Sequence, residues 1–179
     1  MHASLGHDDR RPAPLILGHE AAGVIVGGPR DGERVTVNPL VTCGTCPACK
    51  SGRDNLCPER MIISMPPREG AFAQFIAMRG ENLVIVPDHV SLDAASLAEP
   101  IACGWHTVRL AKEALSVSAK TALVIGGGAI GLGAALSLAA QGVSDVTIVK
   151  PNVLRRDVLN TQCGQTAISP DDLSADAMF

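Results

Sequence analysis

Aromatic side chains are scarce in this sequence, and basic charge is not in excess. Phe, Trp and Tyr together make up 2% of the 179 residues, and Tyr is absent. Nucleobases and sugar rings stack on aromatic side chains, and this chain has few aromatic residues from which to build such a binding surface. The formal net charge of −3 also argues against a nucleic-acid-binding surface. We therefore expect no nucleic-acid partner.

Targeting and membrane segments are also missing. No signal peptide precedes the cysteines, which predicts a cytoplasmic protein without disulfides. The segment Thr121–Ser144 carries no charge, as a membrane helix would. However, the consecutive glycines Gly126, Gly127 and Gly128 would break such a helix, and no aromatic belt or basic cluster flanks it. We expect a buried strand followed by a buried helix, and no membrane partner.

Four cysteines with metal-ligand spacing are the strongest local motif. Cys43, Cys46, Cys49 and Cys57 follow the pattern C-x2-C-x2-C-x7-C on one loop, Val41–Pro58. Four thiolates at this spacing can surround a tetrahedral Zn²⁺ and leave no open position for a substrate. The pattern predicts a structural zinc site.

Two other uses of these cysteines stay open. The pattern is similar to the run that binds a 4Fe–4S cluster, but that run has about three residues before its last cysteine, and this loop has more. Disulfides are the second alternative. The remaining Cys103 and Cys163 are expected to be small packed residues.

The sequence pattern of the first part of the chain predicts short strands. From Leu15 to about Pro87, apolar runs are punctuated by Gly and Pro, which is typical of a β-barrel. Helical sequence comes next, with Ser91 as an expected N-cap and Pro100 dividing two helical stretches. The expected strands are 21–26, 34–37, 71–76 and 83–86.

A second domain is expected after a boundary near residue 117, which gives domains 1–117 and 118–179. The pattern there alternates between apolar strands and helices, as at the start of a parallel α/β sheet. The expected elements are a strand at 121–125, a helix at 129–141, a strand at 146–149 and a helix at 153–163.

A glycine-rich turn joins the first strand of this domain to its first helix. Gly126, Gly128 and Gly131 satisfy G-x-G-x-x-G, and Ala129 and Ile130 open the helix. In this context the glycines allow a tight turn, a close approach of the backbone to a pyrophosphate and close packing of helix on strand. We predict a dinucleotide site, against the alternative of a glycine turn with no ligand.

The choice between NAD and NADP depends on the residue that ends the second strand. An acidic residue there would bind the ribose of NAD, but the sequence has Lys150, and Asp145 lies at the other end of the strand. Lys150, with Arg155 and Arg156 one helical turn on, would attract the 2′-phosphate of NADP. An exposed surface lysine is the alternative.

The pair His19-Glu20 becomes informative when it is considered together with motifs further along the chain. Together with the cysteine loop, Glu99-Pro100 and the glycine turn, it closely resembles the zinc-containing medium-chain alcohol and polyol dehydrogenases, specifically the sorbitol, L-iditol and L-idonate branch. The motifs that carry this resemblance are Gly18-His19-Glu20 with Gly23 and Val24, Gly32-x-Arg34-Val35, the four cysteines, Gly70-Ala71-Phe72-Ala73, Leu97-Ala98-Glu99-Pro100 and the glycine turn.

The resemblance implies a fold, a reaction and roles. The fold is a partial GroES-like β-barrel catalytic domain followed by the first half of a Rossmann sheet. The reaction transfers hydride between a polyol or secondary alcohol and NAD or NADP, and the complete protein is expected to be a homo-oligomer. His19 is implied to be a ligand of a catalytic zinc with one open position, Glu20 to be a carboxylate that binds the zinc or supports a ligand, and Glu99 to be either a ligand or the group that holds a zinc-bound water.

The sequence departs from the family at both ends. The family's zinc-ligating Cys-Gly-[Ser/Thr]-Asp-x-His motif survives only in its tail, at Met1-His2, and the second half of the nucleotide fold would come after Phe179. The strand Thr121–Ile125, central in a complete fold, would then form an exposed edge. We expect little or no activity from this chain and an active complete parent. A non-catalytic zinc-stabilised remnant is the alternative.

Overall fold

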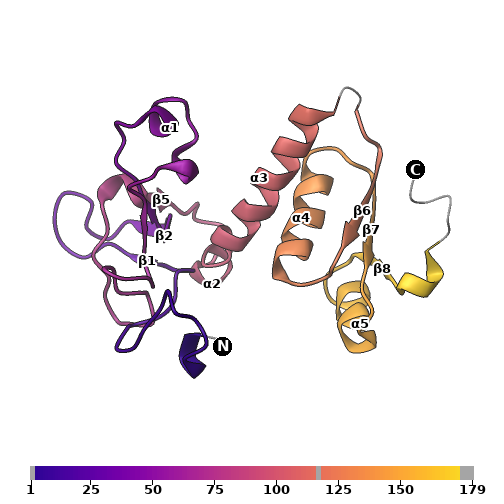
Figure 1. The fold of residues 1–179 in the computed structure, drawn as a ribbon, viewed down its shortest axis with the longest axis horizontal. Helices are drawn as coiled ribbons and strands as arrows, with labels where there is room; N and C mark the ends of the chain where they lie inside the picture. Colours follow the sequence, from indigo (N-terminus) through magenta and orange to yellow (C-terminus); the bar gives the residue numbers. More distant parts are fainter. Residues whose placement is uncertain (1–2, 116–117, 174–179) are drawn as a thin grey trace. The chain divides into compact units, whose positions relative to one another are not determined.

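The computed structural model describes residues 3–115 and 118–173, which belong to two compact units (Figure 1). The first unit is Met1–Glu99 and the second is Pro100–Phe179. The domain boundary after residue 117 stays a prediction. Met1-His2, expected to retain the end of a zinc-ligand motif, lies outside the described residues.

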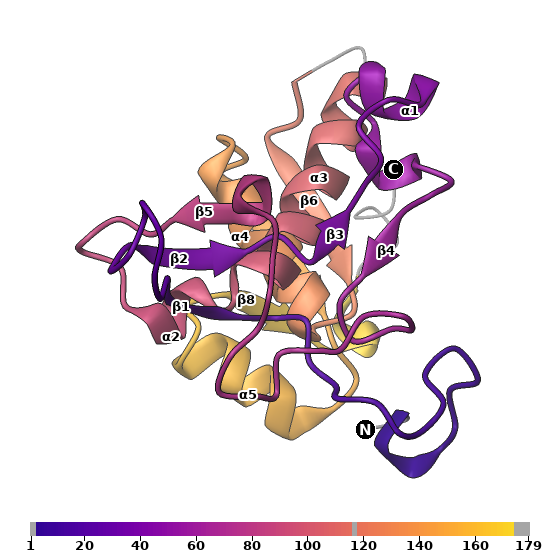
Figure 2. The ribbon, with the colours of Figure 1, turned by 90° about the vertical axis from the view of Figure 1, so that its left-hand side faces the viewer.

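A three-stranded antiparallel sheet forms the centre of the first unit, in the order β1-β2-β5 (Figure 2). Val35 and Val37 are buried, whereas the residues that alternate with them are only half-buried, as the period of two in a strand requires. Val35 pairs with Ile85, which sets the register against β5. The strands are β1 (Ala22–Val24), β2 (Arg34–Val37) and β5 (Leu83–Ile85).

A second, two-stranded ladder leads into the cysteine loop. It pairs β3 (Leu40–Val41) with β4 (Met61–Ile62). The buried Asn82 donates from Nδ2 to the carbonyls of Asn38 at 2.9 Å and Leu40 at 2.8 Å, and so ties β3 to the segment before β5. Between the two strands lie the short helix α1 (Pro47–Lys50) and a 3-10 turn, Asp54–Leu56.

The expected strand at 71–76 is wrong, because this segment has no regular secondary structure. Its start is nevertheless held by backbone hydrogen bonds to a distant segment. Gly70 donates to the carbonyl of Ile16 at 2.7 Å, and Phe72 donates to that of Leu17 at 2.9 Å. Its apolar alternation therefore reflects a loop that pairs briefly and then leaves the ladder.

In the helical stretch, the structure confirms Ser91 as an N-cap, but the predicted division of two helices at Pro100 is wrong. Ser91 caps α2 (Leu92–Ala95) by accepting from the N–H of Ala94 at 3.1 Å. Pro100 does not divide two helices, because it lies in the first turn of α3 (Ala98–Ala114). A proline there loses no intrahelical hydrogen bond, since first-turn N–H groups have no partner within the helix.

The second unit contains a parallel three-stranded sheet in the order β6-β7-β8 (Figure 1). Ala135 of α4, Ile148 of β7 and Leu159 of α5 form one buried core cluster. This is the start of a Rossmann-like sheet. The elements are β6 (Thr121–Ile125), α4 (Ala129–Ala140), β7 (Asp145–Val149), α5 (Val153–Thr161) and the unexpected β8 (Thr166–Ile168), before a 3-10 turn at Pro170–Asp172.

The uncharged segment is thus a strand and a helix, as expected. Within the described residues, no helix combines the length and apolar character needed to cross a membrane. In the same part of the chain β6 pairs only with β7, and Ile125 is 82% exposed. The expected exposed apolar edge is confirmed.

Candidate active site and zinc sites

The four cysteine side chains converge on one point of the first unit. All four sulfurs lie within 4.8 Å of one another. Cys43 Sγ is 3.9 Å from Cys49 Sγ and 3.6 Å from Cys57 Sγ. A tetrahedral zinc with sulfurs at about 2.3 Å requires sulfurs about 3.8 Å apart, and a disulfide would hold them at about 2.0 Å. All four are free thiols, so disulfides are excluded and the sulfurs fit zinc.

Backbone N–H groups support the sulfurs. The N–H of Cys46 donates to Cys43 Sγ at 3.3 Å, and that of Cys49 donates to Cys46 Sγ at 3.5 Å. Hydrogen bonds from the backbone of Thr45 and Cys46 lower the pKa of the Cys43 thiol to about 6. Burial raises the pKa of the Cys49 thiol to about 11. Binding of zinc would counteract this rise in pKa, because a metal ion stabilises the thiolate.

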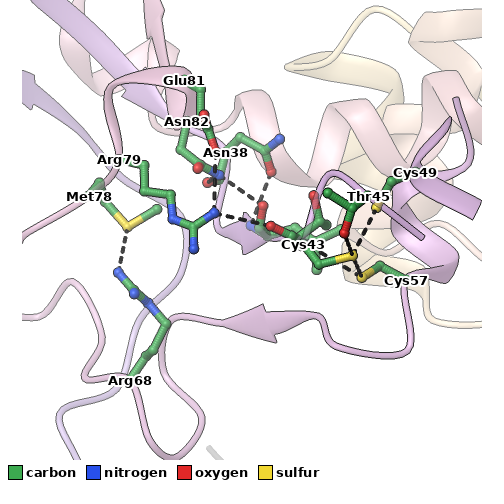
Figure 3. A network of polar contacts seen from close by, with 12 residues as sticks. Asn38, Cys43, Thr45, Cys49, Cys57, Arg68, Met78, Arg79, Glu81 and Asn82 are labelled. Carbon is green, nitrogen blue, oxygen red and sulfur yellow. Dashed lines mark hydrogen bonds and ion pairs between the residues drawn. The ribbon is translucent and has the colours of Figure 1, made fainter.

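Long-range hydrogen bonds attach the cysteine loop to the sheet (Figure 3). Arg79 lies beside Asn82, to the left of the cysteine cluster in this view. Its Nη1 donates to the carbonyl of Thr42 at 3.1 Å, immediately before Cys43. The loop is thus anchored at its first cysteine.

A second group of possible metal ligands lies elsewhere in the first unit. The ligand atoms of His19, Glu20 and Glu99 lie within 4.8 Å of one another. His19 and Glu99 are half-buried, and Glu20 is exposed. One imidazole and two carboxylates form a donor set that zinc accepts, and three protein ligands leave a position open. The structure therefore brings together all three residues that the sequence selected for this role.

Two glycines position His19. Gly18 has a φ of +97°, and a Cβ there would lie 2.7 Å from Phe72. A Cβ on Gly70 would overlap the backbone of Leu17 and Gly18, so only glycine allows the two segments to pair here. The pairing presents His19 to a pocket.

That pocket has a volume of about 300 Å³ and contains residues that the sequence did not single out. Arg11 and Ser64 line it together with His19 and Glu20. Among the described residues other than glycine, Ser64 alone has a positive φ, 69°. Neither residue belongs to a motif, so no sequence signal would have found them.

The glycine turn of the second unit has the geometry of a phosphate site. Gly126 has a φ of +102°, and a Cβ on Gly131 would overlap the carbonyl oxygen of Gly126. Gly128 is the N-cap of α4, and no side chain caps this helix. The N–H groups of Ala129 and Ile130 in the first turn are therefore available to an anion, which the positive end of the helix also favours.

Lys150 lies beside this turn. The N–H of Gly126 donates to the carbonyl of Val149 at 2.9 Å, and a Cβ on Gly127 would lie 3.6 Å from Lys150 Cβ. Arg156 donates from Nη1 to the carbonyls of Lys150 and Pro151, both at 2.7 Å, and so fixes the backbone.

Arg155 and Asp145 lie differently from Lys150. Arg155 is exposed on the first turn of α5, where its N–H donates to the Asn152 cap at 3.0 Å. Asp145 is the first residue of β7, at the opposite end from Lys150. Lys150 is therefore the candidate nearest the glycine turn.

Comparison with known proteins finds dehydrogenases that are similar to this chain across both units. Residues 1–88 match the alcohol dehydrogenase GroES-like domain. Sorbitol dehydrogenase of Bacillus subtilis is 40% identical over 148 residues, which cover 79% of this chain and 41% of that protein.

Solved structures of dehydrogenases are also similar to this chain. A zinc-binding dehydrogenase from Sinorhizobium meliloti bound to NADP has a TM-score of 0.80 and 29% identity, over 95% of this chain and 50% of that chain. A protein described as a short chain alcohol dehydrogenase, from Escherichia coli CFT073 and complexed with NADH, also has a TM-score of 0.80, with 27% identity over 98% of this chain and 52% of that one. The chain spans about half the length of the relatives it matches. Residues 1–88 thus belong to the alcohol dehydrogenase GroES-like domain family, and both units together are similar to alcohol and polyol dehydrogenases.

Proposed function

We propose that this chain is part of a zinc-dependent oxidoreductase that transfers hydride between a polyol or secondary alcohol and NAD(P). The observation that supports this most strongly is the convergence of His19, Glu20 and Glu99 beside a pocket. A module that needs zinc only for folding has no use for a second donor set or for a glycine turn. The family relationship supports the same reaction class.

The residues divide into three roles. Cys43, Cys46, Cys49 and Cys57 would hold a closed, structural zinc. His19, Glu20 and Glu99 would hold a second zinc, with the pocket open to a substrate hydroxyl. When bound, that metal acts as a Lewis acid that lowers the pKa of the hydroxyl, and the nicotinamide accepts the hydride. The turn at Gly126, Gly128, Ala129, Ile130 and Gly131 would orient the cofactor through its pyrophosphate.

Zinc stoichiometry tests this assignment. The purified protein is expected to hold two zinc ions per chain, and His19→Gln is expected to lose the second while the cysteine site keeps the first. Polyol-dependent reduction of NAD(P) in the complete protein should fall at least about 100-fold, since the Lewis acid supplies several kcal/mol. Metal analysis and NAD(P)H absorbance measure both effects.

His89, an exposed loop histidine, provides the matched control. His89→Gln should leave zinc content and activity unchanged. A wild-type protein that binds only the cysteine-site zinc would instead support the alternative, a non-catalytic zinc-stabilised module.

We further propose that NADP is the preferred cofactor, because Lys150 stands beside the glycine turn where an acidic residue would select NAD. Arg155 would assist from the first turn of α5. Lys150→Glu is expected to weaken NADPH binding about 10- to 100-fold, the range for a hydrogen bond to a charged group, and to leave NADH binding unchanged or stronger. Isothermal titration with each nucleotide measures the ratio.

Lys120 supplies the control for this substitution, because it is exposed and lies at the opposite end of the strands, where its carbonyl accepts from Asp145. Lys120→Glu makes the same charge change and should preserve the ratio. Equal loss of NADPH affinity in both variants would show a long-range charge effect and contradict a contact by Lys150.

Three further properties belong to this proposal. Within the described residues, the set of His19, Glu20 and Glu99 contains no thiolate, so we propose that residues 1–179 alone turn over slowly. A rate comparable to that of a full-length relative would contradict this. The complete protein would be a homo-oligomer, and a cytoplasmic location would keep the four thiols reduced.

A further inference from the structure

The pocket beside His19 carries a cation that the proposed reaction does not use. The side chain of Arg11 lines the pocket and is only 17% exposed. Its Nε donates to the carbonyl of Ser64 at 2.8 Å, and its Nη1 donates to Asp8 Oδ2 at 2.6 Å. These two bonds hold the guanidinium in one orientation at the pocket wall.

Most of the donors of Arg11 remain available. A guanidinium has five N–H groups, and the bonds to Ser64 and Asp8 use one on Nε and one on Nη1. The other three, including both on Nη2, make no hydrogen bond to the described residues. A half-buried cation with unmet donors is costly unless solvent or a ligand accepts from it.

The backbone conformation of Ser64 supports a functional role for the placement of Arg11. Ser64 is 2% exposed and has a φ of 69°. A residue other than glycine held in this region costs about 1–3 kcal/mol, and such residues concentrate at functional sites. Here the carbonyl of the strained residue is the one that receives Arg11 Nε. Two segments far apart in the sequence thus combine to place a single guanidinium.

Arg11 shares its one described carboxylate partner with a second arginine. Asp8 pairs with both Arg10 and Arg11, so the three carry a net charge of +1. Hydrogen bonds from both arginines lower the pKa of Asp8 to about 2, so it stays ionised. The two carboxylates Glu20 and Glu99 match the charge of a divalent ion. Arg11 therefore shares its carboxylate partner with Arg10 and has no described ion pair of its own.

We propose that Arg11 binds a carboxylate at one end of the substrate, so that the site prefers hydroxy acids of the sugar-acid class over neutral polyols. This inference rests on the proposed dehydrogenase function. A substrate carboxylate can accept from the unused N–H groups of Nη2, which form charge-assisted hydrogen bonds. A hydroxyl further along the same molecule would then face His19 and Glu20 across the pocket.

A matched pair of ligands tests the proposal. D-gluconate and D-glucitol share one carbon skeleton and differ in a carboxylate against a hydroxymethyl group. Isothermal titration of the zinc-loaded protein is expected to show gluconate binding at least about 10-fold more tightly. Arg11→Met should remove about 10- to 100-fold of gluconate affinity, the range for hydrogen bonds to charged groups, and leave glucitol affinity unchanged.

Arg10 offers a control within the same cluster. It also pairs with Asp8, but its side chain is 71% exposed and it does not line the pocket. Arg10→Met removes the same charge and should preserve the preference for gluconate. An equal loss in Arg10→Met and Arg11→Met would show a general field effect and overturn a direct contact.

A second variant keeps the test decisive if Arg11→Met fails to fold. Asp8→Asn retains the shape of the partner and removes the competing carboxylate, so gluconate should bind more tightly. Weaker binding in this variant overturns the proposal. Tighter binding of D-glucitol 6-phosphate than of D-gluconate overturns the choice of carboxylate over phosphate.

The outcomes separate this inference from the proposed function. Equal binding of gluconate and glucitol by the wild-type protein overturns the role of Arg11 and leaves a polyol dehydrogenase. If neither ligand binds, the substrate site itself is absent and both proposals are wrong.

Discussion

Cys57→Ser is expected to remove one zinc ion per chain and to unfold the loop that the four cysteines organise. Cys57 is fully buried, and its Sγ lies 3.6 Å from Cys43 Sγ. Serine is a poor ligand for zinc, and structural zinc supplies on the order of 10 kcal/mol of folding free energy in zinc-finger peptides. We expect metal analysis to show the loss and hydrogen exchange to show lost protection across Val41–Ile62.

Cys163 is the matched control, because it is a free thiol packed against the core cluster of the second unit. Cys163→Ser should keep both the zinc content and the exchange protection of the loop. Chelation of wild-type protein should reproduce the Cys57→Ser exchange pattern. Full protection without metal would mean that the loop is held by the Arg79 and Asn82 hydrogen bonds alone. A brown protein with iron would revive the iron–sulfur alternative.

Gly131→Ala is expected to damage the fold of the second unit as well as its nucleotide site. The added Cβ would overlap the carbonyl oxygen of Gly126, which is a backbone atom and cannot move aside as a flexible side chain can. Overpacking of this kind costs about 1–3 kcal/mol. Denaturant unfolding, followed by the fluorescence of Trp105, the single tryptophan, should show lower stability, and NADPH binding should fall with it.

Gly128→Ala distinguishes an effect on nucleotide binding from an effect on stability. A Cβ on Gly128 meets nothing within 4 Å, and its φ of −96° suits alanine. Stability should change by less than about 1 kcal/mol, because the entropy gain of alanine in the unfolded chain opposes its poorer fit at an N-cap, whereas NADPH should bind at least about 10-fold more weakly, because the Cβ blocks the approach of the backbone to the pyrophosphate. Unchanged NADPH affinity in Gly128→Ala would support the alternative of a glycine turn with no ligand.

The sequence predicted best where the relevant contacts are local. The cysteine spacing brings four sulfurs together within one short loop, and the glycine turn requires only a strand followed at once by a helix. Both arrangements are confirmed. Local rules failed where a distant partner decides the outcome. The segment 71–76 has the alternation of a strand, but its pairing with the Ile16 segment ends after Phe72.

The sequence by itself determined the first two strands and both helices of the second unit and the grouping of the four cysteines, because each depends on spacing within a few tens of residues. Only the tertiary structure placed Glu99 beside His19 and set Arg11 on the carbonyl of Ser64, 53 residues away. Motifs had pointed to His19 and Glu99, but Arg11 and Ser64 belong to no motif. The close approach of the Gly70 segment to Leu17 and Gly18 is likewise a tertiary contact, which the absence of a Cβ at Gly70 allows.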